Sequence, residues 1–112
     1  MERKLDKIIE AINKAVLTNV VIYDMSELTP YYDYSIIASC KNHNQGQAAC
    51  GYLKDEASKL GMNVRNYSAS NSSTWFLVDL GEVVVHIFVG EERYRYRLDD
   101  LYSNLPHQRL DD

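Results

Sequence analysis

The chain has 112 residues, a formal net charge of −4 at pH 7 and a hydrophobic fraction of 46%. A chain of this length builds one modest core, so we expect a single domain. No apolar run approaches the roughly 20 residues that span a bilayer, which excludes a membrane-spanning helix. The negative charge argues against a protein that grips nucleic acid mainly by its phosphates, and favours a basic protein partner.

Helical and extended patterns follow one another in the first part of the chain. Over 2–16, apolar residues recur at i, i+3, i+4 and i+7, which predicts an amphipathic helix. The apolar runs 20–25 and 34–39 predict two buried strands. Between them we expect a loop, because Pro30 and the residue before it disfavour helix.

A second helix is predicted after the second strand. Asn42 lies three residues before Gln45, a spacing typical of a capped helix start, and Gly61 is the expected stop. Residues 62–67 predict a short third strand, followed by a polar loop over 68–74. The succession of strand, helix and strand predicts a right-handed crossover and a parallel pair. The whole pattern predicts an α/β domain, with helices packed on a mixed sheet.

Residues 75–89 predict a β-hairpin, because two runs of β-branched and aromatic residues flank a turn that contains a glycine. With Leu80 and Gly81 at the turn, we expect Trp75 opposite His86. Side chains alternate along a strand, so the hairpin has two faces. One is an apolar core surface made of Phe76, Val78, Val83, Val85 and Ile87. The other carries Trp75, Leu77, Asp79, Glu82, Val84, His86 and Phe88.

The second hairpin face mixes apolar groups with acids and an imidazole, which favours a surface that binds a partner protein. Trp75 is interpreted as an anchor of that surface, the alternative being a cap on the core. Asp79 and Glu82 would pair with basic side chains, although a solvated turn or a weak cation site is also open. We expect His86 to be a structural or interface group rather than a catalyst.

The last part of the chain is polar. Arg93, Arg95 and Arg97 would share one face if extended, which suggests either a minor rRNA contact or a solvated edge strand. A short helix is predicted over 98–103. Residues 107–112 have no core-facing pattern, so we expect a domain over 1–106 and a frayed tail.

No motif for catalysis or metal binding is present: there is no phosphate loop, no His-Glu-x-x-His and no Gly-x-Ser-x-Gly. We therefore expect no catalytic residues, no metal and no cofactor. Cys40 and Cys50 form no Cys-x-x-Cys pair, which indicates free buried thiols in a reducing cytosol.

The hairpin also carries a resemblance to a known family. Its pattern Trp-x-x-x-Asp-x-Gly-Glu-Val-Val-Val-His-Ile-Phe, the following Glu91-Glu92-Arg93 and then Leu98-Asp99-Asp100-Leu101-Tyr102 resemble the iojap-like ribosomal silencing factors. The run Asp33-Tyr34-Ser35-Ile36-Ile37-Ala38-Ser39 is similar to the second strand of that family. The resemblance extends from about residue 20 to residue 106.

This resemblance implies a fold with nucleotidyltransferase-like topology and a cytoplasmic protein that represses translation. Such a protein would bind the large ribosomal subunit at its intersubunit face, through the L-fourteen ribosomal protein, and sterically block subunit joining. It would be a homodimer when free. The alternative is a small metal-dependent nucleotidyltransferase, but the Gly-Ser turn of those enzymes is replaced by Ser39-Cys40 and no Asp-x-Asp follows.

The entrance to the second helix departs from the family pattern. Cys40 stands where the family has glycine, and Asn44 stands where it has arginine, which puts any contact from this loop in doubt. Gly46 and Gly51 inside the helix each cost on the order of 1 kcal/mol relative to alanine. They either permit close packing or mark a less stable member.

Overall fold

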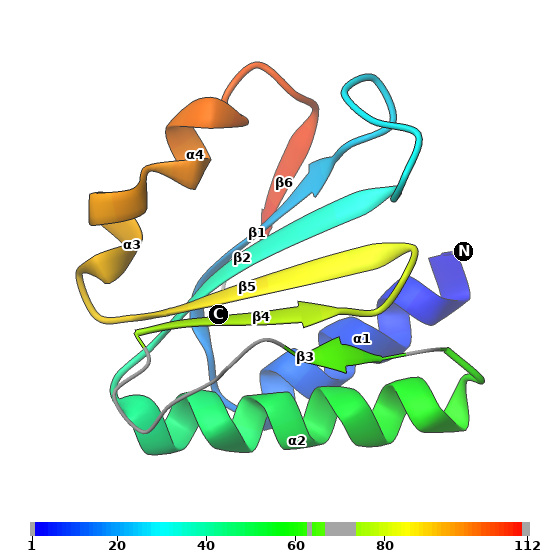
Figure 1. The fold of residues 1–112 in the computed structure, drawn as a ribbon, viewed down its shortest axis with the longest axis vertical. Coiled ribbons are helices and arrows are strands. Elements are labelled where there is room, and N and C mark those ends of the chain that lie inside the picture. Colours follow the sequence, from blue (N-terminus) through cyan, green and yellow to red (C-terminus); the bar gives the residue numbers. More distant parts are fainter. Residues whose placement is uncertain (1, 63, 67–73, 111–112) are drawn as a thin grey trace.

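A computed structural model describes residues 2–62, 64–66 and 74–110. The α/β fold is a six-stranded mixed sheet with helices packed on it (Figure 1). None of the described helices is long and apolar enough to cross a membrane. The elements in chain order are α1 (Glu2–Lys14), β1 (Thr18–Asp24), β2 (Tyr34–Cys40), α2 (His43–Lys59), β3 (Arg65–Asn66), β4 (Trp75–Asp79), β5 (Val83–Val89), α3 (Glu92–Tyr96), α4 (Leu98–Leu101) and β6 (His107–Leu110).

The strand order is β3-β4-β5-β2-β1-β6. The central strands β2 and β5 are parallel, whereas every other pair of neighbours is antiparallel. The predicted parallel pairing across α2 is wrong, because β3 pairs with β4 at the sheet edge and β2 pairs with β5. The longer and almost wholly buried β5 occupies the centre, while β3 has only two residues. Residues 63, 67 and 68–73, which belong to the predicted third strand and loop, lie outside the described residues.

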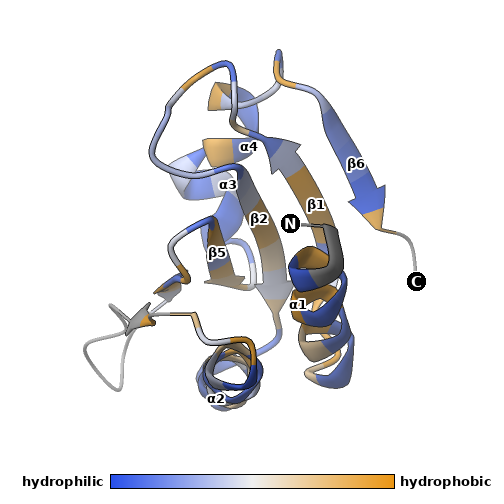
Figure 2. Cartoon of the chain, turned by 90° about the vertical axis from the view of Figure 1, so that its right-hand side faces the viewer, coloured by the Kyte–Doolittle hydropathy of each residue, from blue (hydrophilic) through white to orange (hydrophobic). Residues whose placement is uncertain are grey.

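Helices α1 and α2 cover one face of the sheet, which we call the helix-covered face (Figures 1 and 2). The predicted amphipathic stripe of α1 packs here, with Ile8 and Ile12 fully buried. The hairpin contributes the predicted apolar set, and all five of its members are fully buried: Phe76, Val78, Val83, Val85 and Ile87. This layer is the main core of the protein.

The two glycines of α2 have different surroundings. A Cβ on Gly46 would lie 2.3 Å from Cε2 of Phe76, so only glycine lets α2 approach β4 this closely. A Cβ on Gly51 would meet nothing within 4 Å. The close-packing interpretation therefore holds for Gly46 and does not apply to Gly51.

The predicted ends of α2 are confirmed. The Asn42 side chain accepts a hydrogen bond from the Gln45 backbone N–H at 2.9 Å, which is an N-cap. The Gln45 side-chain amide also donates to the carbonyl oxygens of Ala15 and Val16, which joins α2 to the segment after α1. At the other end, Gly61 has a φ of +71° just after the last helical turn.

The hairpin register is shifted by two residues from the predicted one. Trp75 lies opposite Phe88, and Leu77 lies opposite His86. The Leu80 N–H donates to the Val83 carbonyl at 2.8 Å, which places Gly81, with a φ of +90°, at the tip. The predicted pairing is therefore wrong. Because a shift of two keeps every strand side chain on its own face, the division of the strand residues into two faces is right. The exception is Glu82 in the turn, whose carboxylate pairs with Lys4 of α1 on the helix-covered side.

The C-terminal segment differs most from expectation. Residues 93–97 are not extended, because α3 begins at Glu92 and α4 follows after Arg97. The frayed tail is also wrong for His107–Leu110, which form β6 and pair with β1. This strand is mostly hydrophilic (Figure 2), so backbone pairing rather than an apolar pattern fixes it. Residues 111–112 lie outside the described residues.

A candidate protein-binding face

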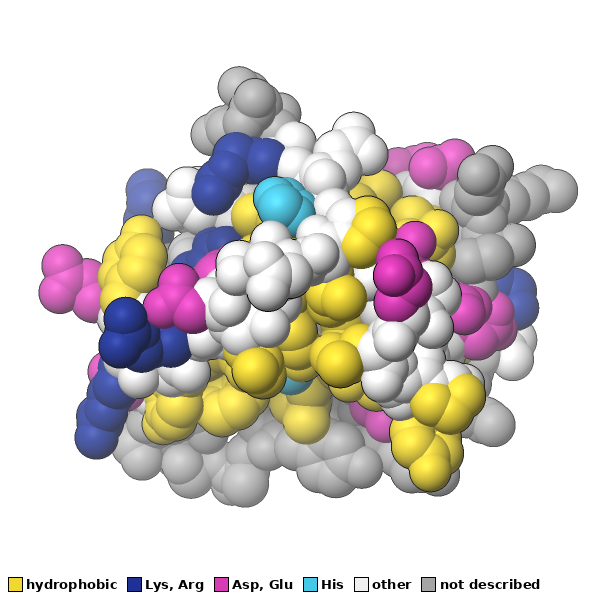
Figure 3. Space-filling view, turned by 90° about the horizontal axis from the view of Figure 1, so that it is seen from above, with side chains coloured by type: hydrophobic (Ala, Val, Ile, Leu, Met, Phe, Trp, Pro, Cys, Tyr) yellow, Lys and Arg dark blue, Asp and Glu magenta, His cyan; other side chains and the backbone are white. Residues whose placement is uncertain are grey.

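The other side of the sheet, which we call the second face, is only partly covered by helices. Figure 3 shows it from above, with hydrophobic side chains in the middle and charged side chains toward both sides. A smaller buried cluster lies here, made of Val21, Tyr23, Met25, Ile37, Phe88 and Tyr102. Partly buried side chains pack against it: Tyr32, Trp75, Leu98 and Leu105. The second face therefore has its own core and an apolar surface above it.

Trp75 is the centre of an aromatic group on this face. Its ring centroid lies 4.6 Å from that of Tyr96, 5.1 Å from that of Phe88 and 5.8 Å from that of His86. Its indole N–H donates to His86 Nδ1 at 3.2 Å. Trp75 stays half-buried, and Tyr96 is 43% exposed. The tryptophan thus packs on the second cluster and also presents surface.

His86 is buried beneath this surface, with 7% of its area exposed. An indole N–H can only donate, so Nδ1 of His86 accepts and the imidazole proton lies on Nε2. Nε2 has no hydrogen-bond partner among the described residues. Burial lowers the pKa of His86 to about 4, so the ring is neutral near pH 7.

The other predicted site residues differ in exposure. Leu77 and Asp79 are half-buried at the surface, whereas Val84 is 7% exposed. Phe88 is fully buried, because α3 folds back over it. The ring centroids of Phe88 and Tyr96 lie 5.7 Å apart. The expectation that Phe88 offers a surface contact is therefore wrong. It supports Trp75 from below.

The two hairpin carboxylates point to different partners. Asp79 accepts a hydrogen bond from the Gly81 backbone N–H at 2.8 Å and shapes the turn. Glu82 pairs with Lys4 of α1 at 3.2 Å, toward the helix-covered face. They do not converge on one cation. Within the described parts of the chain, no group of three or more His, Cys, Asp or Glu side chains could hold a metal ion. Cys40 and Cys50 are both buried and free, as predicted.

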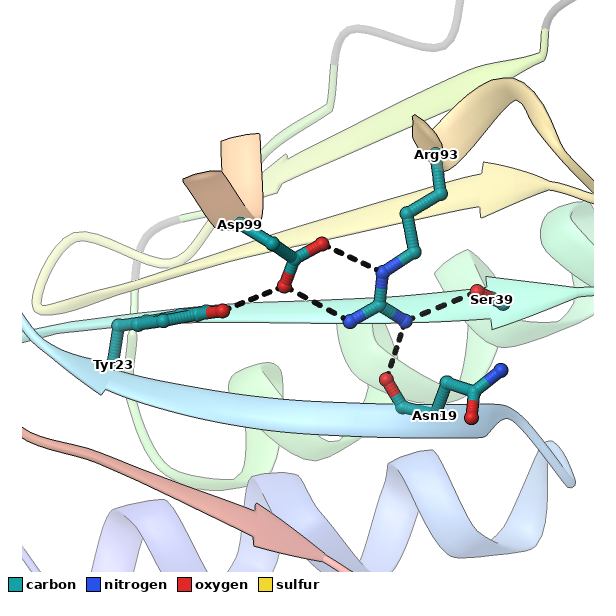
Figure 4. Close-up of polar contacts among 5 residues, drawn as sticks. All are labelled: Asn19, Tyr23, Ser39, Arg93 and Asp99. Atoms are coloured by element: carbon teal, nitrogen blue, oxygen red, sulfur yellow. Dashed lines mark hydrogen bonds and ion pairs between the residues drawn. The ribbon is translucent and has the colours of Figure 1, made fainter. Parts of the chain in front are cut away.

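A buried arginine network holds α3 and α4 on the sheet (Figure 4), and it was not predicted. Arg93 is 3% exposed, and its Nε and Nη2 donate to the two oxygens of Asp99 at 2.8 and 3.1 Å. Its Nη1 donates to Ser39 Oγ at 3.1 Å and to the Asn19 carbonyl. The Tyr23 hydroxyl donates to Asp99 at 2.6 Å. The network joins α3, α4, β1 and β2.

The network changes the acidity of its members. Burial alone would raise the pKa of Asp99, but hydrogen bonds from Arg93 and Tyr23 outweigh it and lower that pKa. The pKa of Tyr23 is raised, first by burial and then by its bond to Asp99. The ion pair is therefore charged near neutral pH. By fixing α3, it fixes where Tyr96 lies against Trp75.

Of the three alternating arginines, only Arg95 and Arg97 have exposed side chains, at 73% and 74%. Each makes a surface ion pair three residues away, with Glu92 and Asp100 respectively. Any rRNA contact from this segment would involve these two. Arg93 serves the fold instead.

The fold and the second face define a small α/β protein with a half-buried aromatic surface suited to protein binding. The family model described as "Ribosomal silencing factor during starvation" matches residues 1–112. The ribosomal silencing factor of Bacillus subtilis (strain 168) is 34% identical over 93 residues, which cover 83% of this chain and 79% of that protein. The chain therefore belongs to the ribosomal silencing factor family.

Other relatives agree with this assignment. The chloroplastic protein Iojap of Arabidopsis thaliana is 35% identical over 71 residues, which are 63% of this chain and 29% of that protein. A crystal structure of a Bacillus halodurans protein superposes with a TM-score of 0.82 at 28% identity, covering 98% of this chain and all of that one. A Chromobacterium violaceum structure at 24% identity, with a TM-score of 0.84, shows the same fold.

Proposed function

We propose that this protein binds the large ribosomal subunit at its intersubunit face and sterically blocks subunit joining, which represses translation. Its contact there is the L-fourteen ribosomal protein, and it acts in the cytoplasm. The proposal rests on family membership. The observation that carries the choice of surface is the half-buried Trp75, which lies with Leu77 on the side of β4 that faces away from α1 and α2.

The chemistry of the second face supports a protein partner. Partly exposed tryptophan and tyrosine side chains on a rigid support are typical of binding hot spots. Trp75 is held by three ring contacts, so little conformational entropy is lost when a partner covers it. Asp79 at the rim and the net charge of −4 favour a partner with basic side chains around an apolar centre.

Two further features belong to the proposal. The exposed Arg95 and Arg97 make a minor contact with rRNA. The free protein is a homodimer, which would cover exposed apolar side chains such as Tyr31 and Leu101 in the absence of ribosomes.

Co-sedimentation with purified ribosomal subunits tests the assignment. We expect binding to large subunits and none to small ones, and we expect prior addition of the protein to reduce the joining of the two. Equal binding to both subunits, or binding to neither, contradicts the proposal.

A variant pair tests the surface. Trp75→Ala should weaken binding by about 2 kcal/mol, as the loss of a hot-spot anchor does. Tyr52→Ala is the matched control, because Tyr52 is an aromatic residue of α2 with 39% exposure on the opposite side of the sheet. Its affinity should equal that of the wild type. If Tyr52→Ala weakens binding and Trp75→Ala does not, the helix side is the docking surface.

A further inference from the structure

A pocket of about 520 Å³ lies beside the buried arginine network, between α3, α4, β1 and β6. Three arginines line it against two aspartates, whereas the chain as a whole has a net charge of −4. We call it the arginine pocket. Its volume is within the range of about 300–1,000 Å³ that is usual for small-molecule sites. The local excess of positive charge favours an anionic ligand.

The inner wall of the arginine pocket is already neutralised (Figure 4). Arg93 donates to both oxygens of Asp99, and the Tyr23 hydroxyl donates to the same carboxylate. Because these groups are bonded to one another, they hold the wall in place rather than bind a ligand. Any ligand would meet the exposed side chains at the mouth of the pocket.

Two arginines at the mouth keep hydrogen-bond donors for a ligand. Arg97 uses its Nε to donate to Asp100 at 3.0 Å, and no described residue bonds to its two terminal amino groups. Arg109 of β6 is exposed and makes no ion pair with any residue that the structure describes. Its positive charge helps to lower the pKa of Asp99, so it lies close to the inner wall. Guanidinium groups bind phosphate with two parallel hydrogen bonds, which suits this pair to a phosphate group.

An aromatic ring and an amide complete the mouth. Tyr94 lines the pocket with 67% of its area exposed, so a base can stack on its ring. The arginine network uses the backbone carbonyl of Asn19 and leaves its side-chain amide, which can donate and accept (Figure 4). Arginine, an exposed aromatic ring and an amide together are typical of sites for an unpaired nucleotide. A simple carboxylate ligand would use the arginines alone.

Helix α3 separates the arginine pocket from the aromatic group around Trp75. Tyr96 contacts the Trp75 ring, whereas Tyr94, two residues earlier, lines the pocket. One short helix thus presents one tyrosine to each site. A partner protein on Trp75 and a ligand in the pocket can therefore be bound at the same time.

We propose that the arginine pocket binds a nucleotide, with its phosphate between Arg97 and Arg109 and its base stacked on Tyr94. The inference rests on the proposed function only for the source of the nucleotide. That source is either an unpaired nucleotide of rRNA beside the protein contact or a free nucleotide. Both present the same phosphate and base to the pocket.

Titration of the isotope-labelled protein with adenosine monophosphate, followed by NMR, tests the site. The signals of Tyr94, Arg97 and Arg109 should shift and saturate. Adenosine monophosphate should bind at least about fivefold more tightly than inorganic phosphate or adenosine alone, because it uses the arginines and the ring together. No saturable binding, equal affinity for phosphate and the nucleotide, or shifts centred on another surface overturns the inference.

Substitutions of exposed side chains separate the pocket from general charge attraction. Arg97→Gln and Arg109→Gln should each weaken nucleotide binding at least about fivefold, because each removes donors to the phosphate. Arg95→Gln is the matched control, because Arg95 is 73% exposed against 74% for Arg97 and does not line the pocket. It should bind the nucleotide as the wild type does. A loss with Arg95→Gln as large as that with Arg97→Gln overturns the inference.

The place of the base has its own test. Tyr94→Leu should reduce the affinity for adenosine monophosphate to about that for inorganic phosphate, and should leave the affinity for phosphate unchanged. If the variant binds the nucleotide as tightly as the wild type, the base does not stack on Tyr94 and the assignment is wrong.

Purified large subunits identify the source of the nucleotide. If it belongs to rRNA, Arg109→Gln should weaken binding to large subunits at least about threefold. If subunit binding is unchanged while binding of adenosine monophosphate falls, the pocket takes a free nucleotide. Failure of the proposed function looks different, because the wild type would then bind no large subunits and still bind adenosine monophosphate.

Discussion

The two faces of the sheet are built by the same strands but from different chemistry. On the helix-covered face, Phe76, Val78 and Val85 are fully buried among other apolar side chains. On the second face, the neighbouring positions carry a half-buried tryptophan and a buried histidine, and the ion pair of the buried Arg93 with Asp99 lies over β1 and β2. Alternation along β4 and β5 therefore gives one hairpin a stabilising surface and the surface that we propose binds a partner.

The difference lies in what each face tolerates. Apolar packing stabilises without directional requirements, so the helix-covered face depends on volume and shape. Polar groups that are buried need particular partners, and removing one partner leaves the other unpaired. We therefore expect mutations on the helix-covered face to act through cavities and clashes. Mutations on the second face should act by leaving a buried polar group without its hydrogen-bond or ion-pair partner.

The largest expected effect is on the helix-covered face. Phe76→Ala should lower the free energy of unfolding by about 3–5 kcal/mol, because it removes a fully buried ring. Trp75→Ala should cost less, about 2 kcal/mol, because that side chain is only partly buried. Urea denaturation of both variants checks this. A loss for Trp75→Ala as large as that for Phe76→Ala would make Trp75 a core residue and erase the contrast between the faces.

The buried ion pair should have the next largest effect. Arg93→Met leaves the partly buried carboxylate of Asp99 without its cation. It should lower the free energy of unfolding by about 3 kcal/mol, at the low end for a buried pair because the Asp99 side chain is 32% exposed. Arg97→Met is the control, because its pair with Asp100 is exposed and should change stability by less than about 0.5 kcal/mol. Thermal unfolding of the two variants measures the difference. Similar small losses would show that α3 is held by packing alone.

Acid should weaken the second face through His86. Its pKa is about 4 in the folded protein and about 6.5 in the unfolded chain, so the unfolded state takes up the proton first. Stability from this group is complete above pH 6.5 and declines as the pH falls toward 4, by at most about 3 kcal/mol. His86→Gln should lack this decline. The pKa of Asp99 is lowered, so protonation of its carboxylate removes stability only at a more acidic pH. Identical pH profiles for wild type and variant would contradict the burial of His86.

The smallest effects come from the glycines of α2, and they have opposite signs. Gly46→Ala should destabilise by about 1–3 kcal/mol, because the new Cβ clashes with Phe76 on β4. Gly51→Ala should stabilise by about 0.5–1 kcal/mol, because the site is open and alanine favours helix. Denaturation midpoints of the two variants test this. If both alanines stabilise, α2 does not pack on β4 as closely as described.

The sequence predicted the elements whose signals are local. The stripe in α1, the Asn42 cap and the alternation in the hairpin each lie within a few neighbouring residues, so α1, the start of α2 and both hairpin faces were foreseen. The predicted hairpin pairing was wrong because Leu80 is not a turn residue: it pairs with Val83 at the base of the turn. The residue types around Gly81 do not decide between these two positions. A polar strand such as β6 has no apolar period to detect.

The candidate site was only partly foreseen, because burial on the second face depends on contacts between distant segments. Phe88 is covered by Tyr96, which comes from a helix that the alternating Arg-Tyr pattern did not predict. Arg93 and Asp99 are six residues apart, a spacing that does not align on one helix and works here because Arg97 breaks the helix with a φ of +57°. The unpaired donor of His86 emerges only once these contacts are in place.

The edge strand β6 has a consequence for how the protein behaves in solution. Its four residues, three of them polar, pair with the outer side of β1, whose Val20, Val21, Ile22 and Tyr23 are all buried. Removing residues 107–112 would uncover the edge of β1 with unpaired backbone groups, which is a template for intermolecular pairing. We therefore expect the short C-terminal strand to protect the protein from aggregation, and a shortened chain should lose solubility before it loses its fold.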